Sequence, residues 1–228
     1  TGAAASAMIC AAGGHPIFAL MASFVVGCAA GAVTALLNIK LKIQPLLAGI
    51  LVMLGLYSIN LRIMGGRPNI SLMNNKTIYT GAESVLPESY LYLIVNVIIL
   101  IFLIALFYFF LNTRLGFALR ATGDNEDMVR AAGIDSNAMK LLGLSLSNGF
   151  VGLAGGMLAQ YQGFSDVTMG TGMVVIGLAS VILGEALFGI RSLARRLVAV
   201  SLGAILYRFA IALALHLGMP AGDVKLVS

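Results

Sequence analysis

The chain has 228 residues, of which 60% are hydrophobic and only 10% are charged, and its formal net charge is +5. Soluble domains carry roughly a quarter of charged residues, so this composition and a mean hydropathy of +0.99 exclude an ordinary soluble protein. Repeated apolar runs of about twenty residues match the thickness of a bilayer when they are helical. We therefore predict an all-α fold, a polytopic transmembrane helical bundle.

The first part of the chain contains two predicted spans. Residues 1–12 are apolar but too short to cross a membrane, so we interpret them as a re-entrant segment or as the end of a helix whose beginning is missing. Pro16 suits the first turn of the next helix, which we place at 17–37. Pro45 can open the following span, 46–60, which carries Ser58 and Asn60 near its end.

A polar excursion covers residues 62–89, and its glycines and prolines favour turns over a further span. We interpret it as an extracytoplasmic loop, either a linker or a small lid. The next apolar run, 91–111, is long enough for a full crossing, and Asn96 is a polar residue within it.

The longest charge-rich segment, residues 112–140, separates two apolar runs that could each cross a bilayer. Within it we predict a short helix over 124–133, with Thr122 or Asp124 as its N-cap and Gly133 closing its far end. A helix of about two turns does not persist alone in water, so we expect a partner to hold it. The apolar face available to that partner consists of Met128, Ala131 and Ala132.

Two further spans follow at 141–160 and 169–187, separated by a polar break at 161–166. Glu185 lies near the end of the second of them, at the margin of the membrane. Such a carboxylate is either a proton or ion site or the partner of a nearby arginine. The closeness of basic residues favours structural ion pairing, and the candidate partners are Arg191, Arg195 and Arg196.

The last apolar run, 197–217, contains Arg208 near its middle. A guanidinium at that depth is costly unless it faces other helices or an acidic partner, so we expect Arg208 to face protein and to be part of the structural ion pairing. The tail, 219–228, is similar to the beginning of one more helix. We therefore expect about six spans, within a single domain over 1–228, in a chain that lacks both natural ends.

Small residues and charge give two further expectations. The glycine pairs Gly27 with Gly31 and Gly152 with Gly156 have the four-residue spacing that allows close helix packing in lipid.

If 112–140 is cytoplasmic, nine basic residues lie inside and four outside, as the positive-inside rule requires. The nine are Lys40, Lys42, Arg114, Arg120, Arg130, Lys140, Arg191, Arg195 and Arg196, and the four are Arg62, Arg67, Lys76 and Lys225. Because these residues lie between spans, the charge does not indicate nucleic-acid binding.

Three stretches carry a resemblance to a known family. The sequence GFALRATGDNEDMVRAAGI, from Gly116 to Ile134, resembles the cytoplasmic coupling segment of permease subunits of bacterial ABC importers, in the branch that includes branched-chain amino acid and ribose transporters. The likeness continues through LGLSLSNGFVGLAGGMLAQYQGF at 142–164 and VIGLASVILGEALFG at 175–189. In that family the short helix docks into a groove on a separate ATPase subunit and passes the motion of ATP-driven closure to the membrane helices.

The resemblance implies a permease in the bacterial cytoplasmic membrane that works by alternating access. Its partners would be two ATPase subunits, a second permease subunit (identical or homologous) and an extracytoplasmic substrate-binding protein. It would hold no cofactor of its own, because ATP is bound by the partner subunits, and the sequence contains no G-x-x-x-x-G-K-[ST] phosphate loop. The residues that would couple to the ATPase are Gly123, Asp124, Asn125, Glu126, Met128, Ala131, Ala132 and Gly133.

Candidates for the translocation path are the polar residues on spans or at their ends, although each could instead bond to a neighbouring helix or to its own backbone. They are Ser58, Asn60, Asn96, Ser145, Asn148, Gln160, Tyr161 and Gln162. The scarcity of charge favours a neutral or zwitterionic solute, and the family likeness favours an amino acid, aromatic or branched-chain, over a sugar or nucleoside. A secondary transporter or channel acting alone and a membrane-embedded enzyme are the alternatives, but no catalytic motif is present.

Overall fold

The computed structural model describes residues 1–73, 75–82, 88–189 and 192–216. The chain divides into two compact units, one formed by Thr1–Ile99 with Thr113–Met169 and the other by Leu100–Asn112 with Gly170–Ser228. The elements, in order, are α1 (Gly2–Ala11), α2 (Pro16–Leu41), α3 (Pro45–Ile63), β1 (Asn69–Ser71), α4 (Ile78–Ala82), α5 (Glu88–Leu111), α6 (Arg114–Asp124), α7 (Glu126–Ala131), α8 (Ser136–Gln162), β2 (Phe164–Asp166), α9 (Met173–Phe188) and α10 (Leu193–His216).

Five of the described helices are long and apolar enough to cross a membrane: α2, α3, α5, α8 and α10. They coincide with five of the expected spans and confirm an all-α, polytopic bundle. The sixth expected span corresponds to α9, which is apolar but only 16 residues long and begins at Met173 rather than at Met169. Helix α1 has ten residues, in agreement with the expectation that the first segment is too short to span.

Prolines open two of the spans, as the sequence predicts. Pro16 and Pro45 each occupy the first turn of their helix, where the missing N–H has no helical partner to lose. His15 caps α2 because its Nδ1 accepts a hydrogen bond from the Ile17 N–H. The opposite end of α2 stops at Lys42, whose φ of 52° lies in the left-handed region.

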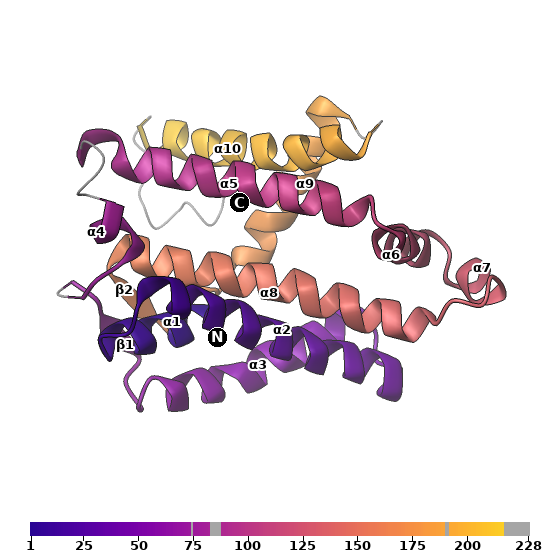
Figure 1. The fold of residues 1–228 in the computed structure, drawn as a ribbon, viewed down its shortest axis with the longest axis horizontal. Coiled ribbons are helices and arrows are strands. Elements are labelled where there is room, and N and C mark those ends of the chain that lie inside the picture. The colour runs from indigo at the N-terminus through magenta and orange to yellow at the C-terminus, as the bar shows by residue number, and fades with distance from the viewer. Residues whose placement is uncertain (74, 83–87, 190–191, 217–228) are drawn as a thin grey trace. The chain divides into compact units, whose positions relative to one another are not determined.

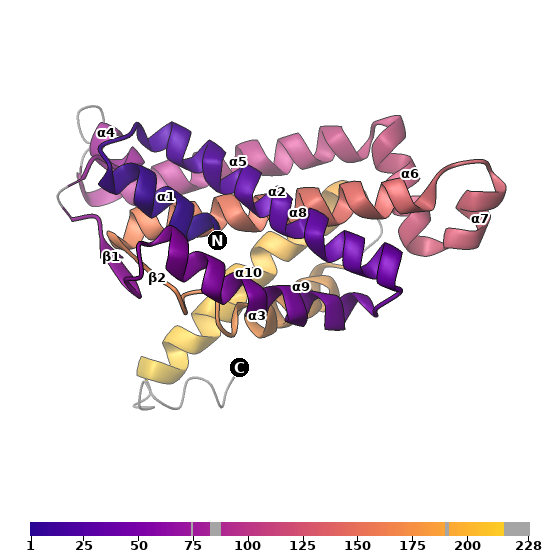
Figure 2. The same cartoon turned by 90° about the horizontal axis from the view of Figure 1, so that it is seen from below.

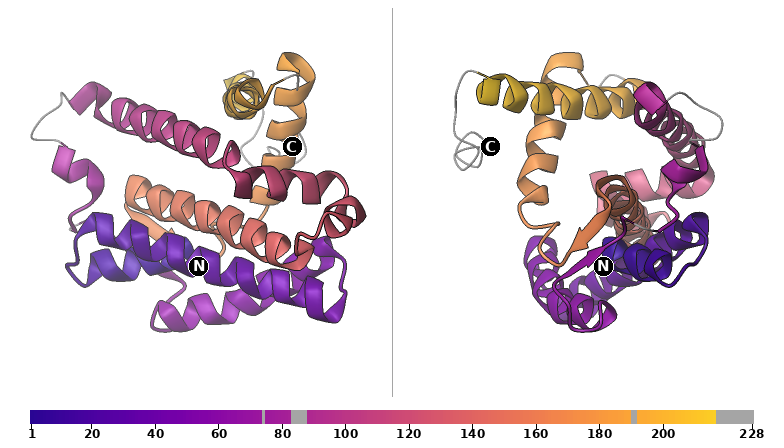
Figure 3. Two further views of the ribbon diagram at one scale, coloured as in Figure 1. Left: turned by 45° about the vertical axis from the view of Figure 1, so that its right-hand side comes forward. Right: turned by 90° about the vertical axis from the view of Figure 1, so that its left-hand side faces the viewer.

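The first unit is built on the antiparallel packing of α2 against α8, with α1 lying along both (Figures 1 and 3). A Cβ at Gly27 would lie 2.5 Å from the Asn148 carbonyl oxygen and 3.1 Å from the Gly152 Cα, so the two backbones meet directly. Gly31 faces the Leu144 carbonyl in the same way. The predicted role of both glycine pairs in close packing is confirmed.

A two-stranded antiparallel sheet joins two connections that are far apart in the sequence. Asn69 pairs with Asp166, Ile70 with Ser165 and Ser71 with Phe164. The sheet lies at one end of α8, and α6 and α7 lie at the other end (Figures 1 and 2). The sequence did not predict this pairing, because three-residue strands have no detectable alternation. The expected polar excursion 62–89 thus contains β1 and α4, and residues 74 and 83–87 lie outside the described residues.

The bounds of α8 differ from the expected span 141–160. The helix begins five residues earlier, at Ser136, because the Asp135 carboxylate caps it by accepting hydrogen bonds from the N–H groups of Asn137 and Ala138. It also continues through the predicted break to Gln162 and ends at Gly163, whose φ is 72°. Its 27 residues therefore form one continuous helix.

In the second unit, α9 and α10 pack against each other through small residues. A Cβ at Gly203 would lie 2.7 Å from the Gly184 Cα, so neither position has room for a side chain. Ser180, one turn earlier on α9, donates its hydroxyl to the Ile176 carbonyl within its own helix. The same principle of backbone contact thus recurs in both units.

Candidate functional site

The segment between α5 and α8 is helical over most of its length, which differs from the expected single short helix over 124–133. Asp124 is the last residue of α6, and α7 starts at Glu126. The N-cap of α7 is Asn125, whose Oδ1 accepts a hydrogen bond from the Met128 N–H, so the prediction of Thr122 or Asp124 as the cap was wrong. Thr122 is buried and bonds to the Ala118 carbonyl instead.

The far end of α7 closes as expected. Ala132 is its C-cap, and Gly133 follows with a φ of 80°, a conformation that suits glycine. The Ile134 N–H then bonds to the Val129 carbonyl, and Val129 is 3% exposed. One side of this two-turn helix is therefore anchored to its own unit.

The opposite side of α7 carries the apolar face that the sequence predicts. Met128 is 66% exposed, and Ala131 and Ala132 are exposed beside it. Gly123, Asp124 and Asn125 are also exposed at the junction with α6. Glu126 is the exception among the proposed coupling residues, because its side chain turns toward α8.

The Glu126 carboxylate is the centre of an ion-pair network. Its Oε1 lies 2.6 Å from Arg130 Nη2 and its Oε2 lies 2.6 Å from Lys140 Nζ. The Ser136 hydroxyl donates to Oε1 at 3.0 Å and accepts a hydrogen bond from Arg130 Nε at 2.7 Å. The hydrogen bond from Lys140 is the largest of the causes that hold the pKa of Glu126 below its usual range, with Ser136 and the positive charge of Arg130 adding to it.

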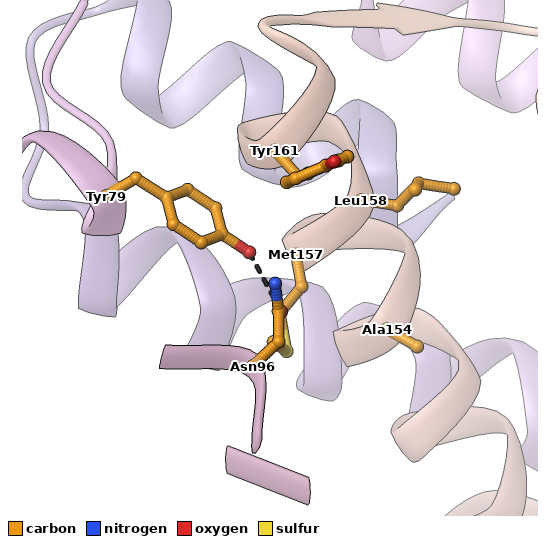
Figure 4. A pocket seen from close by; sticks show the side chains of 6 residues that line it. All are labelled: Tyr79, Asn96, Ala154, Met157, Leu158 and Tyr161. Atoms are coloured by element: carbon orange, nitrogen blue, oxygen red, sulfur yellow. Dashed lines mark hydrogen bonds between the residues drawn. The ribbon is translucent and has the colours of Figure 1, made fainter. Parts of the chain in front are cut away.

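A second candidate site is a cavity of about 270 Å³ near the end of α8 that is remote from α7 (Figure 4). Its walls come from three helices, α4, α5 and α8. Six residues line it: Tyr79, Asn96, Ala154, Met157, Leu158 and Tyr161. None of these side chains is charged at neutral pH, so the cavity is apolar with a few hydrogen-bonding groups.

Hydrogen bonds and ring contacts order the polar side of this cavity. The Tyr79 hydroxyl donates to Asn96 Oδ1 at 3.0 Å, and Asn96 Nδ2 donates to the Tyr92 carbonyl of its own helix at 2.7 Å. The rings of Tyr79, Tyr92 and Tyr161 form a cluster with centroid separations of 5.0 to 5.9 Å. Asn96 and Tyr161, both predicted path residues, are thereby brought together.

Gln160 has a structural role, unlike its two neighbours in the sequence. It is 3% exposed, its Nε2 donates to Ser6 Oγ and to the Pro16 carbonyl, and its Oε1 accepts from the Ile78 N–H. These bonds join α8 to α1, to α2 and to α4. Gln160 therefore does not line the cavity, whereas Tyr161 does and Gln162 is exposed at the helix end.

The remaining path candidates are not brought to the cavity. Asn148 lies at the α2 interface, where its Nδ2 donates to the Leu144 carbonyl, and Ser145 is half-buried on the same helix. On α3, Ser58 is exposed, and Asn60 is half-buried with its Oδ1 shielded from solvent and without a hydrogen-bond partner among the described residues. The cavity residues that sequence reasoning missed are Tyr79, Ala154, Met157 and Leu158. Three of them, Ala154, Met157 and Leu158, share one face of α8 with Tyr161, but an apolar stripe of this kind does not differ locally from a packing face, and Tyr79 comes from α4.

Glu185 is paired as the structural interpretation predicts. Its Oε1 lies 2.9 Å from Arg196 Nε, across the connection between α9 and α10, while the alternative partner Arg191 lies outside the described residues. Arg208 differs from expectation: it is exposed on α10, and within the described ranges no ion pair of its side chain is found. The tail, 217–228, also lies outside the described residues.

The fold defines a class of protein before any comparison is made. Helices long enough to span a bilayer, separated by a connection of short charged helices, are the features of a multi-pass membrane protein. The family described as branched-chain amino acid transport system permease component matches residues 1–225. The chain therefore belongs to this family: it is a permease subunit of a bacterial ABC importer of the branched-chain amino acid and ribose type, and not an enzyme.

Curated relatives agree with this membership. The chain is 42% identical over 213 residues to the tyrosine transport system permease protein of Clostridioides difficile, covering 93% of this chain and 70% of that protein. It is 32% identical over 214 residues to the uncharacterized protein RP368 of Rickettsia prowazekii, covering 92% and 74%. It is also 29% identical over 175 residues to the ribose import permease protein RbsC of Escherichia coli, covering 75% of this chain and 53% of that protein. No solved structure matches the chain significantly.

Proposed function

We propose that this permease subunit carries an amino acid with an aromatic side chain across the cytoplasmic membrane, and that the cavity between α4, α5 and α8 forms part of the path. The observation that carries the proposal is the convergence of three tyrosines and Asn96 at one end of α8. The name of the Clostridioides difficile relative, a tyrosine transport permease, supports the same class of substrate.

The chemistry of the cavity suits such a solute. Aromatic rings attract one another in edge-to-face and offset arrangements, and the exposed ring of Tyr161 presents such a partner. Asn96 offers an amide beside it for hydrogen bonding. A volume of about 270 Å³ is at the small end of ligand pockets, which favours a single small molecule. With no ionised side chain in its walls, the cavity would hold a zwitterion only weakly, as a path requires.

The energy comes from outside the chain in this proposal. Separate ATPase subunits bind ATP and dock on the exposed face of α7 formed by Met128, Ala131 and Ala132. With α7 in the cytoplasm, β1, β2 and the cavity lie toward the outer side, where an extracytoplasmic binding protein would deliver the solute to a pair of permease subunits. Closure of the ATPase pair would then convert the inward-open state into the outward-open state.

The test of the docking face is co-purification of the ATPase with the full-length permease. We expect Met128→Asp to abolish retention of the ATPase, because a carboxylate would be desolvated against the groove. Met73→Asp is the matched control, because Met73 is also highly exposed but lies beside β1 at the opposite end of the unit. If both variants retain the ATPase equally, the exposed face of α7 is not the docking face.

The test of the substrate is ATP-driven uptake into proteoliposomes that contain the permease, its ATPase and its binding protein. Radiolabelled tyrosine is the probe, with phenylalanine, leucine and ribose as competitors. We expect the aromatic amino acids to compete most strongly and Tyr161→Ala to raise the apparent KM, while Tyr57→Ala on the exposed surface of α3 has no effect. If only ribose competes, the substrate class is a sugar and not an amino acid. Ribose is the substrate named for the Escherichia coli relative.

A further inference from the structure

A side-chain network centred on one acidic residue, Glu126, attaches helix α7 to α8. Glu126 opens α7, whereas Ser136 and Lys140 belong to the first turns of α8. Arg130, one turn further along α7, bonds both to Glu126 and to Ser136, which closes the network. Four charged or hydroxyl side chains therefore join the two helices across the connection 132–135.

The two helices would otherwise be free to pivot. The connection contains Gly133, whose φ is 80°, and a backbone hydrogen bond from the Ile134 N–H to the Val129 carbonyl joins it to α7. A glycine-containing link of four residues transmits a displacement poorly unless other bonds brace it. The carboxylate of Glu126 supplies these bonds.

The C-terminal end of α8 reaches the cavity. Helix α8 is continuous from Ser136 to Gln162 and holds Tyr161 in the cavity wall. Gln160 fixes that end to α1, α2 and α4 through three hydrogen bonds. A displacement of α7 that is delivered to α8 is therefore also delivered to the tyrosine cluster.

We infer that Glu126 is a positioning residue for transport: it fixes α7 on the first turns of α8, so that motion of the docked ATPase reaches the cavity instead of being lost at the connection. The inference deepens the proposed function and rests on it. It assigns Glu126 to the inner side of the coupling segment, away from the face that would contact the ATPase.

The neighbouring residue Asp127 provides a matched control. It is acidic, lies in the same first turn of α7 and is exposed, and among the described residues no ion pair of its side chain is found. Glu126→Gln and Asp127→Asn therefore remove the same charge from the same helix end, but only the first removes the bond to Lys140. Lys140→Met breaks the same bond from the α8 side without changing α7.

The experiment measures solute transported per ATP hydrolysed in proteoliposomes that contain the complete transporter. We expect Glu126→Gln and Lys140→Met to retain the ATPase and its basal hydrolysis while the ratio falls by at least about fivefold, the lower end of a usual coupling free energy. Asp127→Asn should stay within about twofold of the native ratio, as expected for an exposed substitution. A native ratio in Glu126→Gln, or loss of the ATPase from that variant, would overturn the inference.

A second measurement needs no ATPase and separates this inference from the proposed function. Spin labels at Met128→Cys and Asn137→Cys, in a background with Cys10→Ala and Cys28→Ala, report the separation of α7 and α8 by EPR. We expect a broader distribution of distances in Glu126→Gln than in the native network or in Asp127→Asn. An unchanged distribution overturns the inference while leaving the proposed function standing. Failure of the native permease to retain any ATPase overturns both.

Discussion

Helix α8 meets the rest of its unit through two faces of opposite character. On one face, Gly152 meets the backbone of α2 directly, and Gly149 and Gly156 leave space that α2 side chains such as Cys28 and Ser23 fill, so that none of the three has room for a Cβ. On the other, Met157 and Tyr161 leave a cavity. Two functions are therefore divided between two faces of one helix. The glycine face holds α8 in place against α2, and the face with large side chains is available to a solute.

The largest expected effect comes from filling the closed face. In Gly152→Ala the new Cβ would overlap the Ser23 carbonyl and lie 3.0 Å from the Gly27 Cα, so we expect a loss of about 3 kcal/mol or more, because backbone cannot move aside. Fluorescence-detected size-exclusion chromatography should show little folded protein. The control is Gly155→Ala, whose Cβ would lie 3.4 Å from the Ala3 nitrogen, an ordinary contact. Similar yields of the two variants would refute the distinction between the faces.

The next effect concerns Gln160, which lies at the boundary between the faces. Gln160→Leu removes its bonds to Ser6, Pro16 and Ile78 and leaves buried polar groups without partners. We expect a loss of about 1–3 kcal/mol of stability, measured as a lower midpoint of thermal unfolding in detergent. Gln162→Leu, two positions further on and exposed, should change it by less than about 0.5 kcal/mol. An equal shift in both would mean that the burial of Gln160 is not what stabilises this end.

The open face should respond in function more than in stability. Tyr79→Phe removes the hydroxyl that bonds to Asn96 and frees that amide to change its orientation. We expect the apparent KM for uptake to rise several-fold, because a neutral hydrogen bond contributes about 0.5–1.5 kcal/mol. Tyr90→Phe tests the specificity of this effect, since Tyr90 is exposed on α5, the helix of Asn96, and does not line the cavity. An unchanged KM in Tyr79→Phe would show that the cavity is not part of the translocation path.

The network at the far end of α8 predicts a pH dependence. Because the pKa of Glu126 is lowered in the folded protein, the ion pairs contribute fully above its ordinary value of 4.5 and are lost as the pH falls through the lowered value. The EPR distribution between α7 and α8 should therefore stay narrow from neutral pH down to that value and broaden only below it. If the distribution already broadens near pH 6, a group other than Glu126 controls the contact between α7 and α8.

The smallest effect is expected for the ion pair in the second unit. Glu185→Gln removes a pair whose side chains are both partly exposed, so we expect a loss of at most about 1 kcal/mol and no change in substrate preference. Thermal unfolding and uptake competition measure the two quantities. The exchange Glu185→Arg with Arg196→Glu should restore stability if the pair itself matters. A change in substrate preference would instead favour an ion or proton site at Glu185.

Sequence reasoning located the spans because each is a long apolar run bounded by proline, glycine or charge, as at Pro16 and Pro45. It also located the exposed apolar face of α7, since a short helix with Met128 and two alanines among charges is a local pattern. The role of that face in coupling stays a prediction.

The parts that sequence reasoning missed depend on contacts between distant residues. The pairing of β1 with β2 joins positions almost a hundred residues apart, and no strand-like alternation announces it. The structural role of Gln160 was missed for the same reason: a polar residue near a helix end resembles a path residue until its partners on α1, α2 and α4 are known. The N-cap of α7 is Asn125, one residue after Asp124 and three after Thr122, and the prediction missed it because three polar residues compete for the cap locally.

The contact between α2 and α8 has a consequence for how the protein can change. At Gly27, Gly31 and Gly152, what a new side chain would strike is a carbonyl or a Cα, which every amino acid possesses. No substitution on the facing helix can make room, so searches for second-site suppressors of changes at these positions should find none there. Gly149 is different, because it faces the Cys28 sulfur and the Phe24 ring, and smaller residues at those two positions could restore the fit. Among these four glycines, three cannot be compensated from the facing helix and Gly149 can.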